Sequence, residues 1–139
     1  MSSWLLPCNA KYYDIEGVYK NLESVDWKQS VTKVEVGDTA YIYVSAPVGG
    51  IAYKCVVEAI NKPTATIDDL KFRIDSTNYG NYGRYMQLRF IASYDTLKLS
   101  FEVLSKNGLK GRVMCQRCMD EELENYVEKV TRVVKQSEE

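Results

Sequence analysis

Two strand-forming segments joined by a short turn lie in the middle of the 139-residue sequence, and they constrain the fold more than any other feature. The first, Thr39–Ser45, consists mostly of β-branched and aromatic residues, and the second, Ile51–Ile60, has the pattern of a further strand. The residues between them, Pro47-Val-Gly-Gly50, are typical of a turn. The two segments therefore predict an antiparallel hairpin.

Segments on either side of the hairpin predict further strands and helices. Toward the N-terminus we expect a strand at Trp4–Leu6 that ends at Pro7, a helix over Tyr12–Asn21, and a polar loop over Ser24–Lys33. Gly17 weakens the predicted helix by about 1 kcal/mol relative to alanine. The remaining predicted elements are a short helix starting near Thr66–Asp69, a glycine-containing loop at Asn78–Gly83, a strand at Tyr85–Tyr94, a helix at Phe101–Lys106 capped by Ser100, a strand at Val113–Cys115, and a helix that begins after Asp120.

The predicted strands outnumber the helices, and hairpins take the place of regular crossover helices. This order favours an α+β fold built on a curved sheet or small barrel over a doubly wound parallel sheet. The length predicts one domain. We expect this domain to span residues 1–134 and the acidic residues 135–139 to form a frayed tail.

The sequence contains no histidine, which excludes several classes of enzyme. Ser-His-Asp and Cys-His nucleophile systems, His-liganded zinc hydrolases and nucleases that use histidine all need this residue. The sequence also has neither a P-loop nor a G-x-G-x-x-G string for binding a nucleotide cofactor. We therefore expect a protein that is not an enzyme and needs neither a cofactor nor a metal.

Charge is unevenly distributed along the chain. The whole sequence has 18 basic and 19 acidic residues, for a net charge of −1. Residues 119–139 contain three bases and seven acids (−4), which leaves 15 bases and 12 acids (+3) for the other 118 residues. A mildly basic body permits nucleic acid as a partner without requiring it.

The expected location is the cytoplasm. Four cysteines in a chain without a signal peptide suggest a reducing compartment, and the N-terminal segment lacks the charged region of a targeting sequence. No window approaches 18 apolar residues, so we expect no membrane partner.

Aromatic residues and one cysteine pair are the side chains that stand out. The 11 tyrosines fit either strand packing or base stacking. Trp27, placed in a polar loop, either fills a gap in the core or forms the wall of a ligand pocket. Cys115-Gln-Arg-Cys118 matches C-x-x-C directly before a helix, which leaves structural thiols, a redox pair and a metal site as alternatives.

The order of motifs resembles the EVE domain of the PUA-like superfamily, which also contains YTH, ASCH and SRA-type readers of modified bases. It particularly resembles the EVE-like modules that precede HNH nucleases in modification-dependent restriction proteins. The resemblance extends over roughly residues 3–130. Its motifs are Trp4-Leu-Leu-Pro-Cys-Asn9, Trp27-Lys-Gln-Ser30, the Val36–Pro47 run that begins Val-Gly-Asp, Ile51–Val57, and Gly108-Leu-Lys-Gly111 followed by Gln116-Arg117.

This resemblance implies a PUA-like curved sheet or pseudo-barrel flanked by helices that recognises a flipped, modified base, most simply a modified cytosine in DNA, in a defence or restriction context. By position, Trp27 would be one wall of the base pocket, with Tyr43 or Tyr12 opposite it. Asn9, as both donor and acceptor, would read the base edge. The remaining residues implied are Ser45, Ala46 and Pro47 in the pocket, and Lys11, Lys28 and Arg117 on phosphates.

Two other functions stay open at this point. One is an RNA-binding PUA-like module that recognises tRNA or a modified RNA base, which a contact to the 2′-OH would distinguish. The other is a small redox or zinc protein that uses Cys115 and Cys118. Because the chain carries no HNH motif, cleavage would require a nuclease on a separate chain. The oligomeric state cannot be deduced from the sequence.

Overall fold

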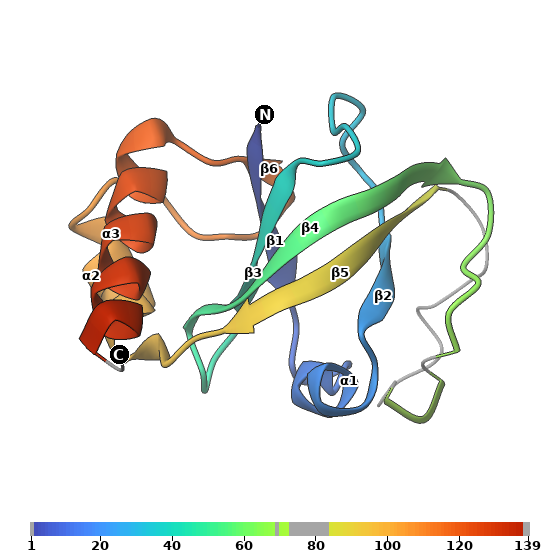
Figure 1. Cartoon of the computed structure of the whole chain (residues 1–139), viewed down its shortest axis with the longest axis horizontal. Coiled ribbons are helices and arrows are strands. Elements are labelled where there is room, and N and C mark those ends of the chain that lie inside the picture. Colours follow the sequence, from blue (N-terminus) through green and yellow to red (C-terminus); the bar gives the residue numbers. More distant parts are fainter. Residues whose placement is uncertain (1, 69, 73–83, 138–139) are drawn as a thin grey trace.

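A mixed sheet of six strands organises the computed structural model, which describes residues 2–68, 70–72 and 84–137 (Figure 1). The strand order is β2-β5-β4-β3-β1-β6. β1 and β3 are parallel, and every other neighbouring pair is antiparallel. The strands are β1 (Ser3–Cys8), β2 (Ser24–Lys28), β3 (Thr39–Val44), β4 (Gly50–Lys62), β5 (Tyr85–Ser93) and β6 (Arg117–Cys118).

The predicted central hairpin is confirmed. β3 and β4 pair antiparallel from Thr39↔Val56 to Val44↔Gly50, with an irregularity after Ile42. In the connection, Gly49 has a φ of 61°, a left-handed conformation that glycine adopts without strain. The α+β fold on a curved sheet is confirmed as well. Among the described strands, β1 and β3 form a parallel pair whose connection contains α1, and the other neighbouring pairs are antiparallel, so the alternation of a doubly wound sheet is missing.

The helices begin where side chains cap them. α1 (Ile15–Asn21) starts after Asp14, whose carboxylate accepts a hydrogen bond from the Gly17 N–H at 3.1 Å, so the helix is shorter than the predicted Tyr12–Asn21. The Ser100 cap is confirmed, because its hydroxyl accepts from the Val103 N–H at 3.4 Å. The other helical elements are α2 (Phe101–Ser105), α3 (Glu121–Ser137) and the 3₁₀ helices η1 (Leu70–Phe72) and η3 (Thr96–Leu99).

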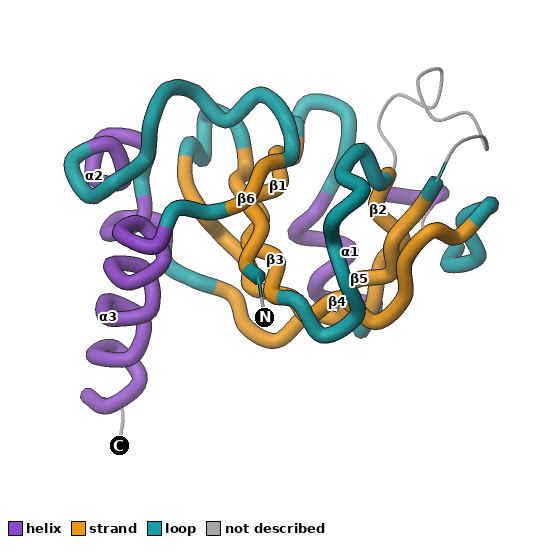
Figure 2. Tube along the Cα trace, turned by 90° about the horizontal axis from the view of Figure 1, so that it is seen from above, coloured by secondary structure: helices purple, strands orange, loops and turns teal. Residues whose placement is uncertain are grey.

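The two faces of the sheet carry separate cores. Alternate residues of β1 and β3 point to opposite faces, so Leu6 and Ile42 lie in one core and Leu5 and Tyr41 in the other. The first core is closed by α1, β2 and Phe72, and we call it the inner core. The second is covered by α2, α3 and η3, and we call it the helix-covered core. Figures 1 and 2 show α2 and α3 on one side of the sheet and α1 on another.

Four predicted boundaries are wrong for physical reasons. Residues 24–28 form the strand β2 and not a loop, because Val25 and Trp27 face the inner core and alternate with polar residues on the opposite face. The alternation extends over only this short strand, so the sequence pattern did not reveal it. The strand predicted at Val113–Cys115 lies instead at Arg117–Cys118. β1 continues through Pro7, where β6 no longer pairs with it and the edge is open. Residues 66–68 are not helical, and the nearby helical turn is η1.

The loop predicted at Asn78–Gly83 lies outside the described residues. In the described part of the chain, none of the helices is sufficiently long and apolar to cross a membrane.

Candidate functional site

The turn that follows β1 carries several of the predicted pocket residues. Its backbone is closed by a hydrogen bond from the Tyr12 N–H to the Asn9 carbonyl at 3.0 Å. The side-chain oxygen of Asn9 accepts from the Lys11 N–H at 3.0 Å. Because the oxygen is engaged in the turn, the amide N–H₂ of this exposed side chain is the group available to a ligand. Lys11 lies at the surface, with its ammonium 5.6 Å from the centre of the Tyr12 ring.

The end of β3 lies against this turn. The Ser45 N–H donates to the Cys8 carbonyl at 3.0 Å, and the Ser45 hydroxyl accepts from the Ala10 N–H at 3.3 Å. These contacts follow from the parallel pairing of β1 and β3, which places both carboxyl ends at the same edge of the sheet. Ala46 and Pro47, joined by a cis peptide bond, are exposed directly beyond Ser45.

Trp27 contributes its ring to the inner core from β2. It is half-buried, and its ring meets the buried ring of Tyr13 edge-on, with the centroids 6.0 Å apart and the planes at 87°. Tyr13 follows the turn after β1, so this contact joins β2 to the segment that holds Asn9 and Tyr12. No local sequence pattern distinguishes Tyr13 from Tyr12 as the partner of Trp27.

Gln116 connects the two edge strands of the sheet. Its side-chain amide donates to the Lys28 carbonyl at 2.5 Å, and its side-chain oxygen accepts from the Ser30 N–H at 2.9 Å. Gln116 directly precedes β6, and Lys28 ends β2, so these bonds bring the edges of the six-stranded sheet together. The Lys28 side chain is exposed beside this junction.

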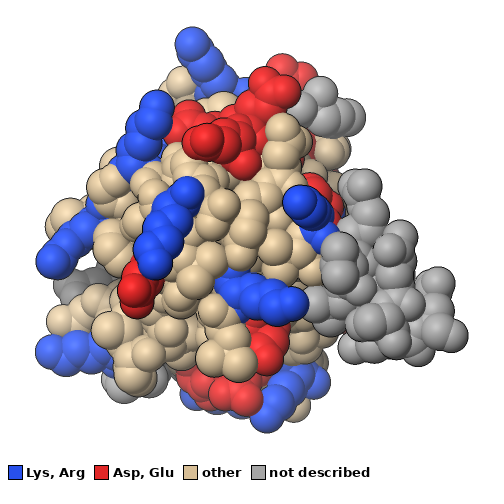
Figure 3. All heavy atoms as spheres, turned by 90° about the vertical axis from the view of Figure 1, so that its left-hand side faces the viewer, with Lys and Arg blue, Asp and Glu red and all other residues tan. Residues whose placement is uncertain are grey.

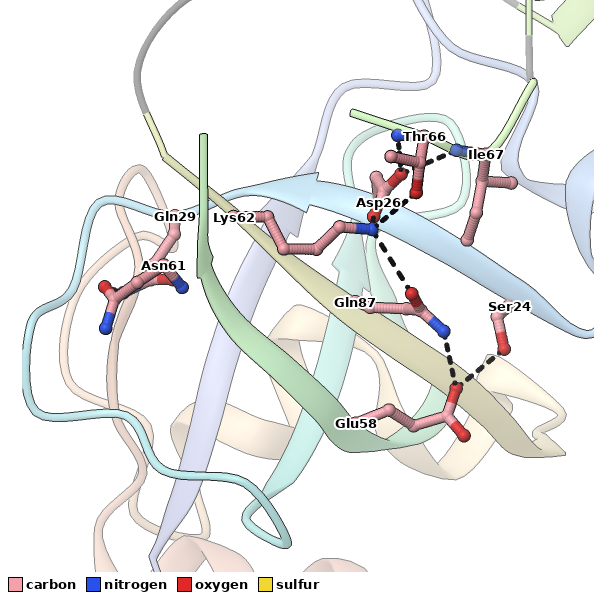
Figure 4. Close-up of polar contacts among 9 residues, drawn as sticks. All are labelled: Ser24, Asp26, Gln29, Glu58, Asn61, Lys62, Thr66, Ile67 and Gln87. Atoms are coloured by element: carbon pink, nitrogen blue, oxygen red, sulfur yellow. Dashed lines mark hydrogen bonds and ion pairs between the residues drawn. The ribbon is translucent and has the colours of Figure 1, made fainter. Parts of the chain in front are cut away.

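Two polar clusters connect β2 and the residue after it to the end of β4 (Figure 4). Gln29, only 5% exposed, accepts from the Asn61 N–H at 2.8 Å and donates to the Asn61 side chain at 3.1 Å. Asp26 pairs with Lys62 at 2.6 Å and accepts from two backbone N–H groups. The two N–H groups belong to Thr66 and Ile67. Asp26 therefore fastens the last residue of β4, Lys62, and the segment after it to the outer face of β2.

Two predicted site residues lie away from this region. Tyr43 packs in the helix-covered core and is 9% exposed, so the expectation that it faces Trp27 is wrong: the two side chains lie on opposite faces of the sheet. Burial raises the pKa of Tyr43. Arg117 pairs directly with Leu5, so its side chain also lies on the helix-covered face, where it donates to the Lys110 carbonyl at 2.9 Å.

The aspartate of the Val-Gly-Asp motif has a structural role. Asp38 is 2% exposed, and its carboxylate accepts from the Trp4 indole N–H and the Glu35 N–H, both at 2.9 Å, and from the Ser2 N–H at 3.1 Å. Burial by itself raises the pKa of this carboxyl, but the hydrogen bonds outweigh it and the pKa is lowered. Asp38 therefore fastens β1 to the start of β3.

The four cysteines fall into two pairs of different character. Cys8 and Cys55 are buried, and burial raises the pKa of both thiols, that of Cys8 to about 12. Cys115 and Cys118 are free and exposed. Within the described ranges, no group of three or more His, Cys, Asp or Glu side chains is placed to hold a metal ion.

Gln29 and Gln116 lie in two of the motifs that carry the EVE resemblance, but their sequence context indicates no role for either side chain. Their partners are backbone groups about 30 and 90 residues away in sequence, and such contacts leave no local pattern.

In the part of the chain that the structure describes, the surface charge on the helix-covered side forms no patch of a single sign. On the face that carries α2 and α3, basic and acidic side chains are interspersed (Figure 3).

Comparison with known proteins identifies the fold. No protein-family model matches the sequence, and no curated protein is similar to it in sequence. Solved structures do match. ASCH from Zymomonas mobilis superposes with a TM-score of 0.64 at 8% identity, over 93% of this chain and 95% of that one. The chain has a PUA-like fold.

Human THYN1, solved in complex with DNA that contains 5-methylcytosine, matches 94% of this chain and 97% of its own, with a TM-score of 0.59 and 13% identity. A protein from Pseudomonas putida matches 93% and 99%, with a TM-score of 0.64 and 15% identity. These similarities establish the PUA-like architecture that the sequence predicted. The narrower resemblance to EVE domains stays a prediction.

Proposed function

We propose that this protein is a nucleic-acid-binding module of the EVE type that recognises a modified base, a modified cytosine in DNA, without catalysing a reaction. The observation that carries the proposal is the match over 94% of the chain to THYN1, which was solved with 5-methylcytosine DNA. Cleavage in a restriction context would be the work of a separate nuclease chain.

The arrangement around Trp27 supports base recognition. A flipped base needs an aromatic surface for stacking, hydrogen-bonding groups at its edge, and phosphate contacts outside the pocket. Trp27 provides the aromatic surface, and the buried Tyr13 ring supports it edge-on from the segment that also carries Tyr12 and the side-chain amide of Asn9. Ser45, Ala46 and Pro47 border the turn, and Lys11 and Lys28 are exposed cations near it.

Two corrected residues have other roles in this proposal. Tyr43 is assigned to the helix-covered core and not to the pocket. The Asn9 oxygen is occupied by the Lys11 N–H, so we propose that Asn9 reads an acceptor on the base and not a donor–acceptor pair.

The two tryptophans allow a fluorescence test. Trp4 is 7% exposed and bonded to Asp38, whereas Trp27 is half-buried at the site, so a bound base should quench Trp27 alone. We would titrate the protein at fixed salt with matched oligonucleotides, with and without 5-methyl- or hydroxymethylcytosine, and with RNA. We expect quenching that depends on the modification and is absent in Trp27→Phe.

A pair of asparagine variants gives a matched control. Asn9→Ala should weaken binding to the modified DNA by roughly five- to tenfold, the effect of one lost hydrogen bond to the base. Asn125→Ala, an exposed asparagine on α3, should leave it unchanged. Equal binding of modified and unmodified DNA would refute modified-base recognition, and binding confined to RNA would refute the DNA assignment.

A further inference from the structure

The segment between α2 and β6 is strongly basic over a short length. From Ser105 to Met119 the sequence contains four cations and no carboxylate. Residues 110–116, which we call the basic loop, run from the helix-covered side of the molecule toward β1 (Figure 2). In a protein of net charge −1, this concentration of one sign needs an explanation. The four cations are Lys106, Lys110, Arg112 and Arg117.

The basic loop also exposes an apolar side chain. Met114 is 81% exposed, whereas Leu109 and Met119, the apolar residues on either side of the basic loop, are 5% and 7% exposed. Lys110 and Arg112 are exposed as well. A long apolar side chain that is exposed to water between cations contributes little to the folding free energy of the domain.

The loop is braced at both ends. Arg117 donates from Nη1 to the Lys110 carbonyl at 2.9 Å, and its Nη2 is buried without a partner among the described residues. At the other end, Gln116 bonds to the Lys28 carbonyl and the Ser30 N–H, which follow Trp27 by one and three residues. The exposed side chains are therefore presented from a fixed frame whose Gln116 end adjoins the proposed base site, which lowers the entropy lost on binding.

We propose that the basic loop is a second contact surface for the nucleic acid, an inference that rests on the proposed function. Lys110 and Arg112 bind phosphates of the strand that carries the recognised base. Met114 packs against the base stack at the position that the flipped base vacates, as apolar side chains do when they enter between base steps. Arg117 and Gln116 are positioning residues that hold the loop.

The phosphate contacts are tested by the salt dependence of binding to a 5-methylcytosine duplex. Lys110→Ala/Arg112→Ala should weaken binding roughly tenfold or more near 0.1 M salt. It should also make the slope of log K against log salt less negative by about 2. The control Lys98→Ala/Lys129→Ala removes the same charge from exposed positions on η3 and α3 and should change the slope little.

The role of Met114 is tested by comparing duplex and single strand. Met114→Ala should weaken binding to the modified duplex by about fivefold or more, with little effect on a modified single strand, where no stack is opened. Leu97→Ala, which removes an apolar side chain that is 79% exposed on η3, is the matched control.

The outcomes separate the two proposals. If the wild-type protein discriminates modified DNA but the loop variants behave like their controls, the basic loop is not a contact surface and only this inference fails. If the wild-type protein binds no nucleic acid, both proposals fail. An equal loss for Met114→Ala on duplex and single strand would refute its place in the stack.

Discussion

At the scale of single residues, one buried carboxylate joins distant parts of the chain. Asp38 accepts three hydrogen bonds, from the indole of Trp4 and from two backbone N–H groups. A carboxylate that is almost fully buried is tolerated because these three donors replace the hydrogen bonds that its oxygens would make to water. The aspartate of the Val-Gly-Asp motif is therefore explained by these structural contacts and not by a role in binding.

Asp38→Asn should destabilise the protein by about 2 kcal/mol at neutral pH, because charge-assisted hydrogen bonds are lost. The folded pKa of Asp38 is lowered, so its stabilisation is present above the unfolded pKa of about 3.9 and is lost as the pH falls through the folded value. Urea unfolding at pH 7 and below pH 3 measures this. The difference between variant and wild type should shrink in acid, and a constant difference would contradict the assignment.

At the scale of elements, α1 is governed by its neighbours more than by its own propensity. Asp14 caps the helix by accepting from Gly17 N–H. A Cβ on Gly17 would lie 2.4 Å from the Asp14 carboxylate and 2.8 Å from the ring of Phe72. Glycine at this helical position is therefore required by the cap and by the packing of η1.

Gly17→Ala should destabilise the protein by about 1–3 kcal/mol, the usual cost of overpacking. Helix propensity alone predicts the opposite sign, a gain of about 1 kcal/mol. Denaturant unfolding decides between them. Lys20→Ala in the same helix breaks only an exposed pair with Glu16 and should change stability by less than about 0.5 kcal/mol. Stabilisation by Gly17→Ala would show that Asp14 and Phe72 move at little cost.

At the scale of the whole molecule, the curved sheet is held closed by contacts between its edges. β2 and β6 lie at opposite ends of the strand order, yet Gln116 bonds to the end of β2. On the other face, α3 is fastened to the sheet by Glu128, which contacts the Tyr41 hydroxyl and pairs with Lys54 at 2.8 Å. The proposed base site therefore lies beside a junction that closes the sheet.

Gln116→Ala should destabilise this junction by about 1–2 kcal/mol, because the Lys28 carbonyl and the Ser30 N–H lose their partner. Amide hydrogen exchange gives a local measurement: the Ser30 N–H should lose protection, while amides in the middle of β3 keep theirs. Asn125→Ala serves as the control on α3. Unchanged protection of Ser30 would show that the edges are held together by other contacts.

The sequence by itself determined the elements with strong local patterns. Hydrophobic alternation and turn residues located β3, β4 and β5, the Ser100 cap located α2, and helical spacing located α3. The order of motifs led to the PUA-like fold. These features could be predicted because each depends on residues close together in sequence, where backbone preference and side-chain period act directly.

Only the tertiary structure decided which side chains meet. Tyr43 and Trp27 are both aromatic residues at plausible positions, but the pleat of β3 turns Tyr43 toward the helices. Trp27 lies in β2, and Tyr13 meets it from a segment that ends before α1. Gln116 is fixed by partners almost 90 residues away. Such pairings depend on the register and curvature of the whole sheet, and no local pattern encodes them.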